Sequence, residues 1–359
     1  HQQQLLELIA SPKIQIITLT ITEKGYCLTS GGELDEAHPD IQKDLGNPYF
    51  PISAPGLLAR GLKYRMEAGS GPISIISCDN LSRNGRSTRQ AVTGVAGLFS
   101  AENASWIRDH VSFPDTMVDR IVPATSELDS VGFERETGME DSGLVICEPF
   151  SQWVIESNIA GERPEWERVG VQFVDDVAVY EEIKLRLLNA SHSALAYLGL
   201  LAGYEYIHEA MADPLLARFT EYLMEKEISP LIQPPIGFDL KQYTQSILKR
   251  FANPAIQYRT AQVANDGSLK LQQRIYPTLT EYLQMSVGAP GLVLVVAAWL
   301  HCLTTPAYAS LFSDPGGEYI RSYSGDNLPQ LLTSESETLG MIWGDEAFKG
   351  QIRAVADDL

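Results

Sequence analysis

Three residues with chemically useful side chains lie in one apolar stretch of the chain: Lys184, Asn189 and His192. The stretch from 179 to 203 is typical of one long helix, in which successive residues advance by about 100°. With Lys184 at zero, His192 falls at about 80°, Asn189 at about 140° and Glu181 at about 60°. The four polar groups are therefore predicted to share one broad sector of the helix.

Two interpretations of this polar sector remain open from the helix alone. A lysine pressed against apolar surface can lose its proton near neutral pH, and can then accept a proton from a substrate hydroxyl. An amide and an imidazole on the same side can hold the reacting oxygen. The alternative is an amphipathic helix with a solvated side, because Lys and Glu three residues apart are ordinary surface neighbours.

The second half of the chain is predicted to surround this helix with others. Apolar residues recur with helical spacing from about residue 177 onward. We therefore expect an all-helical second domain over 177–359. Besides the helix that begins at 179, helices are expected over 204–212, 214–227, 240–251, 278–287, 291–303 and 334–342.

The first half, 1–176, alternates strands, polar turns and helices, which is typical of a parallel sheet in an α/β domain. Runs rich in β-branched residues predict the strands, and Pro and Gly at their ends delimit the helices. The expected strands are 13–21, 73–77, a strand-like segment in 113–123, 144–146 and 153–155, and the expected helices are 55–68 and 87–99.

Polar residues follow the ends of the first two predicted strands. Thr22 and Glu23 come after the first strand, and Asn80 lies in the polar turn after the second. Ligands of α/β proteins sit at the carboxyl ends of the strands, so these residues are candidates for a binding site. Helix capping or turn formation is an equally open interpretation of Asn80.

Two further charged groups have both a structural and a functional interpretation. Asp119 and Arg120 lie between apolar residues, so they form either a structural salt bridge or part of a site. Lys270 follows a turn at 266–268, so it is either one charge of an exposed loop or a cation delivered to a cleft.

Composition excludes several classes of partner. The 359 residues include 46 Asp and Glu against 27 Lys and Arg, a net charge of −19, which disfavours nucleic acid and anionic membranes but permits an anionic substrate in a local basic pocket. The run at 291–300 is too short to cross a bilayer, and no signal peptide is evident.

Cysteine and histidine usage argues against a metal site. Cys27, Cys78, Cys147 and Cys302 are far apart, which favours free thiols in a reducing cytoplasm, and the six histidines form no HExxH motif. The chain also contains no complete GxGxxG in strand–turn–helix order, no GxSxG and no phosphate-binding P-loop.

Seven blocks of the sequence, in order, resemble the long-chain mannitol dehydrogenase family, and specifically its sugar-acid branch, the fructuronate reductases or mannonate oxidoreductases. The resemblance covers nearly the whole chain, and the VDRIVP block and the Lys-x4-Asn-x2-His spacing are its most specific parts. The blocks are TITEKGYC at 20–27, SCDNLSRNG at 77–85, FPDTMVDRIVP at 113–123, CEPFSQWVIE at 147–156, KLRLLNASHSALAYLG at 184–199, RFANP at 250–254 and DGSLK at 266–270.

The resemblance implies a Rossmann-like domain over 1–176 and a metal-independent oxidoreductase that interconverts a secondary alcohol and a ketone with NAD. In this reading Lys184 is the general base. Asn189 and His192 hold the reacting oxygen and the substrate, and Glu181 helps to relay the proton outward. Hydride transfer requires such a base for the hydroxyl proton, in agreement with the residue chemistry.

The same resemblance implies that Asn80 polarises the oxygen beside the nicotinamide and that Asp119 lines the same pocket. Val118, which precedes Asp119, is expected to contact the cofactor. Thr22 and Glu23, at the end of the first strand, are expected to do so as well.

The substrate implied by the resemblance is a sugar acid. Lys270 matches a substrate-binding lysine, and Gln262 with Arg259 matches the sugar-acid members. Arg259 and Lys270 are therefore expected to bind a carboxylate. We favour D-mannonate and D-fructuronate, while tagaturonate or a neutral polyol stay open as alternatives.

The chain also departs from the family pattern. The family begins with a strand and a Gly-rich turn that holds the cofactor pyrophosphate, and this segment is not found. The expectation is therefore an N-terminally incomplete domain, for which a non-catalytic binding protein is an alternative, and a generic helical interaction module is a third. The oligomeric state and the choice between NAD and NADP are not predicted.

Overall fold

The computed structural model describes residues 1–29 and 31–321, so the helix expected over 334–342 lies outside the described residues. The chain forms two compact units. The first combines 1–120 with 151–181, and the second combines 121–150 with the chain from 182 onward. The boundary expected after residue 176 falls close to the end of the first unit, whereas the assignment of 121–150 to the second unit was not predicted.

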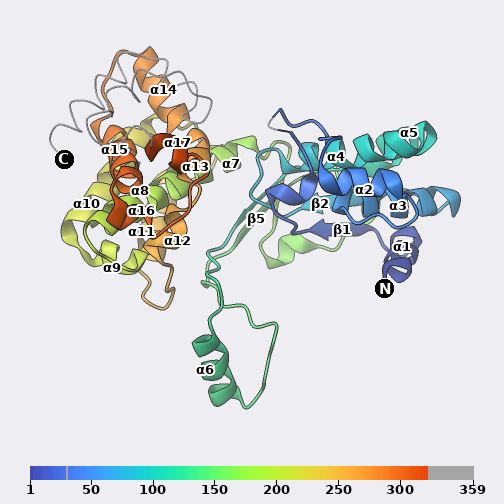
Figure 1. The fold of residues 1–359 in the computed structure, drawn as a ribbon, viewed down its shortest axis with the longest axis horizontal. Helices are drawn as coiled ribbons and strands as arrows, with labels where there is room; N and C mark the ends of the chain where they lie inside the picture. Colours follow the sequence, from blue (N-terminus) through green and yellow to red (C-terminus); the bar gives the residue numbers. More distant parts are fainter. Residues whose placement is uncertain (30, 322–359) are drawn as a thin grey trace. The chain divides into compact units, whose positions relative to one another are not determined.

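The first unit contains the predicted parallel sheet. Its strands are β1 (Ile16–Leu19), β2 (Ile73–Ser77) and β3 (Val111–Ser112), in the order β1-β2-β3 with both pairs parallel. All five residues of the central strand β2 are buried, which explains its continuous β-branched sequence. Its helices are α1 (Gln2–Ala10), α2 (Pro39–Gly46), α3 (Ala54–Glu67), α4 (Asn84–Phe99) and α5 (Ala101–His110), with the short η1 (Glu23–Tyr26) (Figure 1).

A second small sheet in this unit is not all parallel. It consists of β4 (Thr116–Asp119), β5 (Gln152–Glu156) and β6 (Gln172–Val174). Strand β5 pairs with β4 antiparallel and with β6 parallel. The strand predicted at 153–155 is thus confirmed as part of β5, and its antiparallel pairing with β4 was not predicted. The short η2 (Trp166–Val169) precedes β6.

The strand predicted at 144–146 does not exist. Residues 141–150 are turn and irregular backbone, and Val145 is exposed. The carbonyl of Leu144 accepts a hydrogen bond from the Thr125 hydroxyl instead of a strand partner. Three apolar residues predict a strand only when a neighbouring strand is available, and this segment has none in its described surroundings.

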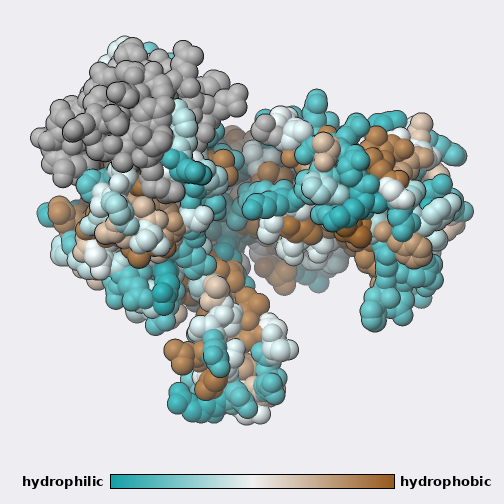
Figure 2. Space-filling model, in the orientation of Figure 1, coloured by the Kyte–Doolittle hydropathy of each residue, from teal (hydrophilic) through white to brown (hydrophobic). Residues whose placement is uncertain are grey.

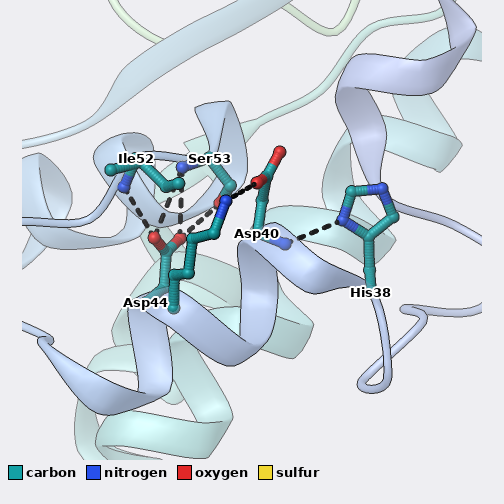
Figure 3. A network of polar contacts seen from close by, with 6 residues as sticks. His38, Asp40, Asp44, Ile52 and Ser53 are labelled. Carbon is teal, nitrogen blue, oxygen red and sulfur yellow. Dashed lines mark hydrogen bonds and ion pairs between the residues drawn. The ribbon is translucent and has the colours of Figure 1, made fainter.

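A buried carboxylate fixes the start of α3. Asp44 at the end of α2 accepts hydrogen bonds from the Ile52 and Ser53 amides and from the Ser53 hydroxyl (Figure 3). Ser53 is the N-cap of α3 and accepts from the Gly56 amide. A side chain at Gly56 would collide with Asp44, since a Cβ there would lie 2.1 Å from Oδ2.

The second unit is helical, as predicted. Two of its helices, α8 and α15, pack against each other and are almost entirely buried. The apolar run at 291–300 is therefore a buried helix, and no helix among the described residues is both long and apolar enough to cross a membrane. The unit contains α8 (Ala190–Leu201), α9 (Ile207–Ala212), α10 (Pro214–Tyr222), α11 (Leu240–Phe251), α12 (Thr260–Ala264), α13 (Gly267–Arg274), α14 (Tyr276–Gln284), α15 (Pro290–Thr304), α16 (Pro306–Ala309) and α17 (Gly317–Arg321), with the short η4 (Leu223–Ile228) and η5 (Ser229–Leu231).

Helix α6 (Glu127–Thr137) belongs to the 121–150 segment and has no buried residue. It carries exposed apolar side chains, including Leu128 and Val131. Brown surface is visible over this helix in Figure 2. A capping box at Ser126 and Asp129 and an αL glycine, Gly138, define its two ends.

Candidate active site

The central helix, defined as residues 178–201, changes its winding in the middle. It begins as α7 (Ala178–Ile183), continues as the π-helix η3 (Lys184–Asn189) and ends as α8. The amide of Ala190 donates to the carbonyl of Leu185, five residues back, as a π-helix requires. The single uniform helix expected from the sequence is therefore interrupted at the candidate residues.

The π-helical turn η3, called the π-turn below, reduces the angles that separate the candidate residues around the helix axis. In a regular α-helix Lys184 and Asn189 would be about 140° apart. In a π-helix residues i and i+5 lie one turn apart on the same face. His192, three α-helical residues beyond Asn189, then falls within about 60° of both. The three side chains occupy a narrower sector than the regular helix predicted.

Burial of this sector is uneven. Lys184 and His192 are each 7% exposed, and Asn189 is half-buried. The solvated-face interpretation of this helix is therefore wrong for Lys184 and His192. The role of Lys184 as a general base stays a prediction.

The His192 imidazole is held between two aromatic rings. It stacks on the Phe251 ring with 5.0 Å between the ring centroids, and it meets the Tyr258 ring edge-on with 5.1 Å between the centroids. Its Nε2 atom is buried and has no hydrogen-bond partner among the described residues. Burial first, and then the charges of Arg274, Lys270 and Arg250, lower the pKa of His192 to about 3. The ring is neutral at physiological pH.

Lys270 lies on a helix, α13, not on the exposed loop that was one interpretation of 259–274. Asp266 adopts a left-handed conformation, with φ of 58°, immediately before this helix. A Cβ at Gly267 would lie 2.3 Å from the Tyr197 hydroxyl and 2.4 Å from Trp299 Nε1, so only glycine permits this approach. The DGS sequence thus packs α13 tightly against α8 and α15.

Asp314 stabilises the same junction. Its Oδ2 accepts from the Ser268 amide at 2.9 Å and from Trp299 Nε1 at 3.1 Å. Lys270 and Arg274 are four residues apart on α13 and therefore share a face. Both are half-buried, and both contribute to the low pKa of His192.

Arg250 supplies a third cation near His192, but its charge is balanced. Its guanidinium forms a bidentate pair with Glu148, at 2.7 Å from Nη2 to Oε1 and 2.9 Å from Nε to Oε2. It also lies over the Phe150 ring at 4.0 Å. The side chains of Arg250 and Glu148 are 6% and 2% exposed, so this is a buried structural pair.

Arg259, the other expected carboxylate ligand, lies on the surface. Its side chain is 63% exposed, and its guanidinium pairs with Glu205 at 3.3 Å. It is not among the charges that act on His192. The geometry of the second unit therefore supports Lys270 and not Arg259 as a cation near the central helix.

In the first unit, the loops after β1 and β2 meet as parallel strands require. The carboxylate of Asp79 accepts from the amides of Ile21 and Thr22 and from the Tyr26 hydroxyl. The next residue, Asn80, is exposed at the end of β2, and Thr22 and its neighbour Glu23 are exposed at the end of β1.

The helix-capping interpretation of Asn80 is wrong, because the N-cap of α4 is Arg83. Asn84, the first residue of that helix, anchors it through bonds to the carbonyls of Ser77, Asp79 and Thr116.

Val118 and Asp119 lie on β4, where they pair in register with Trp153 and Gln152 of β5. Asp119 is 4% exposed. Glu181 lies on α7, and its carboxylate is 3.5 Å from the amide of Arg83. Burial raises the pKa of Glu181 above its usual range, while hydrogen bonds from Ser82 and Arg83 partly oppose this rise.

Comparison with known proteins identifies the family. Residues 1–168 match the profile of the mannitol dehydrogenase Rossmann domain, and residues 176–328 match that of the mannitol dehydrogenase C-terminal domain. The chain belongs to the mannitol dehydrogenase family. The first unit is accordingly a Rossmann-like domain with the helical family domain after it.

Similar proteins within this family have different described activities. The chain is 43% identical to D-mannonate oxidoreductase of Escherichia coli over 82% of this chain and 61% of that protein. It is 38% identical to mannitol 2-dehydrogenase of Aspergillus fumigatus over 100% of this chain and 74% of that protein.

A solved structure, Pseudomonas fluorescens mannitol 2-dehydrogenase with NAD and D-mannitol, matches with a TM-score of 0.85 and 39% identity, covering 100% of this chain and 74% of that one. The chain thus spans about three fifths to three quarters of the length of these relatives.

Some residues of the site environment were missed by the sequence analysis. Arg274 and Asp314 were not singled out, and the pairing of Glu148 with Arg250 was not foreseen. A signal existed for Arg274, because a helix beginning at Gly267 places it one turn after Lys270. No group of His, Cys, Asp and Glu arranged to hold a metal ion occurs in the part of the chain that the structure describes.

Proposed function

We propose that the protein interconverts a secondary alcohol and a ketone of a sugar acid with NAD, and that D-mannonate and D-fructuronate are its preferred pair. The observation that carries this proposal is the central helix. It has a buried Lys184, a π-turn that aligns Asn189 with it, and a neutral His192 one turn beyond. Membership of the mannitol dehydrogenase family supports the reaction type.

In the oxidation direction Lys184 accepts the hydroxyl proton of the substrate as the general base. Asn189 donates its amide N–H to the same oxygen and stabilises the negative charge that develops there. Neutral His192 contacts the substrate through the ring nitrogen that no described residue occupies. In the reduction direction Lys184 returns the proton to the oxygen.

Glu181 carries the proton onward to water. It precedes Lys184 by one helical turn, and its raised pKa lets the carboxyl take up a proton more readily than an exposed glutamate does. Its hydrogen-bond partners Ser82 and Arg83 belong to the loop after β2.

NAD supplies the acceptor for the hydride when it is bound. The residues of the first unit that would hold it are Thr22, Glu23, Asn80, Val118 and Asp119. The fit rests on the Asp79 network, which joins the carboxyl ends of β1 and β2 and leaves the adjacent polar residues exposed at that edge. The Pseudomonas fluorescens relative was solved as a complex with NAD.

The choice of a sugar acid rests on the positive charge near His192. Lys270 and Arg274 on α13 both act on that ring. Relatives of similar identity act on mannonate or on mannitol, so their names alone do not decide the substrate. Tagaturonate and neutral polyols are the competing substrates, and Arg259 stays a predicted carboxylate ligand that the geometry does not favour.

The test begins with an NADH titration of the purified chain, followed by the cofactor's fluorescence. Saturable binding is expected, and NADH oxidation should then be faster with D-fructuronate than with D-tagaturonate or D-fructose. A folded chain that does not bind NADH would contradict the enzyme proposal and favour a binding protein without catalysis. Faster turnover of D-fructose would retain the oxidoreductase and replace the sugar acid by a polyol.

We also propose a cytoplasmic location. The thiols of Cys27, Cys78, Cys147 and Cys302 are all free, as expected in a reducing compartment. Non-reducing mass spectrometry of the protein from its native cells should find four unmodified thiols, and a disulfide would contradict this location.

A further inference from the structure

Arg274 is the last residue of α13 and reaches the central helix at its candidate site. Its Nη1 donates to the Ser193 hydroxyl at 3.1 Å and to the Asn189 carbonyl at 3.4 Å. One of these acceptors belongs to a proposed substrate-binding residue, and the other is the neighbour of His192. The guanidinium therefore lies beside both residues that are expected to hold the substrate.

The guanidinium of Arg274 places a positive charge beside the central helix. The charge of Arg274 is the first of the three cations that act on His192, and Lys270 is the second. Half-burial of Arg274 reduces the screening of its charge by water, so a carboxylate bound here would interact more strongly than at an exposed arginine.

We propose that Arg274 binds the carboxylate of the sugar-acid substrate and sets the preference for an acid over the corresponding neutral polyol. This inference rests on the proposed function. The planar guanidinium offers parallel N–H donors that match a carboxylate, whereas Lys270 acts as a point charge. Ser193 and the Asn189 carbonyl orient the guanidinium, so Arg274 is positioned before the substrate arrives.

The structure also permits a purely structural role, in which Arg274 only ties α13 to α8. The two roles predict different losses of ligand affinity when Arg274 is replaced. A structural arginine would affect the binding of every ligand in the same proportion. A carboxylate ligand affects the acid and spares the polyol, since D-mannonate has a carboxylate at C1 where D-mannitol has a CH2OH group and the other five carbons are the same.

The experiment measures the binding of D-mannonate and of D-mannitol to the full chain by isothermal titration calorimetry. Arg274→Gln removes the charge, and Arg274→Lys keeps it without the planar fork. Arg218→Gln is the matched control, because Arg218 is an exposed arginine on α10 in the same unit. Circular dichroism and the Tm of each variant establish that it is folded.

We expect Arg274→Gln to weaken D-mannonate binding at least tenfold while D-mannitol binding changes less than twofold. Arg274→Lys should lose part of the acid preference, and Arg218→Gln should keep all of it. If Arg274→Gln fails to fold, the Arg274→Lys variant decides, because it retains a donor for Ser193. A reduced acid preference in that variant supports the proposal.

Three results would overturn the inference, and each has a different meaning for the function. An unchanged acid preference in Arg274→Gln rejects Arg274 and leaves the proposed reaction intact. An equal loss of both ligands assigns Arg274 a structural role. A wild-type chain that binds D-mannitol more tightly than D-mannonate rejects the proposed sugar-acid substrate and this inference together.

Discussion

At the scale of single residues, burial gives two ordinary side chains unusual properties. A lysine on a helix surface is charged and solvated, but Lys184 is 7% exposed on η3, where three of its neighbours are also buried. A histidine in water titrates near neutrality, but His192 is enclosed by two aromatic rings and faced by cations. The imidazole of His192 is thereby held in its neutral form.

Lys184→Ala tests the proposed base. Turnover should fall by about 10²–10⁴-fold, because general base catalysis contributes that much. The Tm and circular dichroism should show a folded protein. Lys226→Ala is the matched control, since Lys226 is an exposed lysine in the other π-helix, η4. A variant at Lys184 that retains wild-type turnover would reject its assignment as the base.

His192→Gln tests the neutral imidazole through the pH dependence of stability. The pKa of His192 is about 3 in the folded chain and about 6.5 when unfolded. Between these values the unfolded chain holds the extra proton, so acid lowers the stability of the folded state as the pH falls below about 6.5. The loss amounts to about 2 kcal/mol at about pH 5 relative to about pH 7.5.

Urea unfolding at those two pH values measures this effect. The decrease in the free energy of unfolding on acidification should be about 2 kcal/mol smaller in His192→Gln than in the wild type. Equal decreases in the two proteins would mean that His192 titrates normally when folded.

At the scale of elements, the π-turn and the start of α13 are what position the site. Lys184 and Asn189 align only because the hydrogen-bonded partners in η3 are five positions apart in the sequence. Lys270 and Arg274 approach His192 only because Gly267 lets α13 pack against Tyr197 and Trp299. Both features are local. The π-turn brings together groups that a regular helix would separate, and Gly267 permits an approach that a bulkier residue would prevent.

Gly267→Ala tests the close packing of α13 at Gly267. The added Cβ would overlap Tyr197 and Trp299, so α13 must shift, at a cost of about 1–3 kcal/mol in the free energy of unfolding. The shift should also weaken D-mannonate binding. Gly288→Ala is the control, because a Cβ there meets no atom within 4 Å. Equal stability of the two variants in urea unfolding would contradict the close packing at Gly267.

The sequence predicted these elements unequally. The helix expected over 240–251 coincides with α11, and the strand expected over 73–77 coincides with β2, because periodic apolar residues report burial directly. The π-turn was not predictable, since KLRLLN has the same apolar spacing whether it winds as an α- or a π-helix. The helix α13 was obscured by its Asp-Gly-Ser start, which is equally typical of a turn.

At the scale of the whole molecule, the division into two units does not follow the order of the chain. The segment 121–150 leaves the first unit after β4 and joins the second before the chain returns as β5. A linear sequence gives no sign of such a return, because the contacts that hold the segment lie far along the chain. The candidate residues were found from local spacing, whereas Glu148 could be recognised only through its distant partner Arg250.

The pair of Glu148 and Arg250 should contribute strongly to the stability of the second unit. Glu148 also accepts the Ile121 amide at 2.6 Å, so one carboxylate joins both ends of the 121–150 segment to α11. Glu148→Gln keeps an acceptor for that amide but leaves the buried guanidinium without its carboxylate. Breaking a buried pair in this way costs about 3–5 kcal/mol in the free energy of unfolding.

Urea unfolding of matched variants separates the buried charge from the rest of the contact. Glu165→Gln is the control, because its pair with Arg168 is 70% and 76% exposed and should contribute less than about 1 kcal/mol. The double variant Glu148→Gln/Arg250→Met should regain part of the loss, since it leaves no buried charge. If Glu148→Gln instead unfolds like the wild type, the 121–150 segment is held by its other contacts and not by this pair.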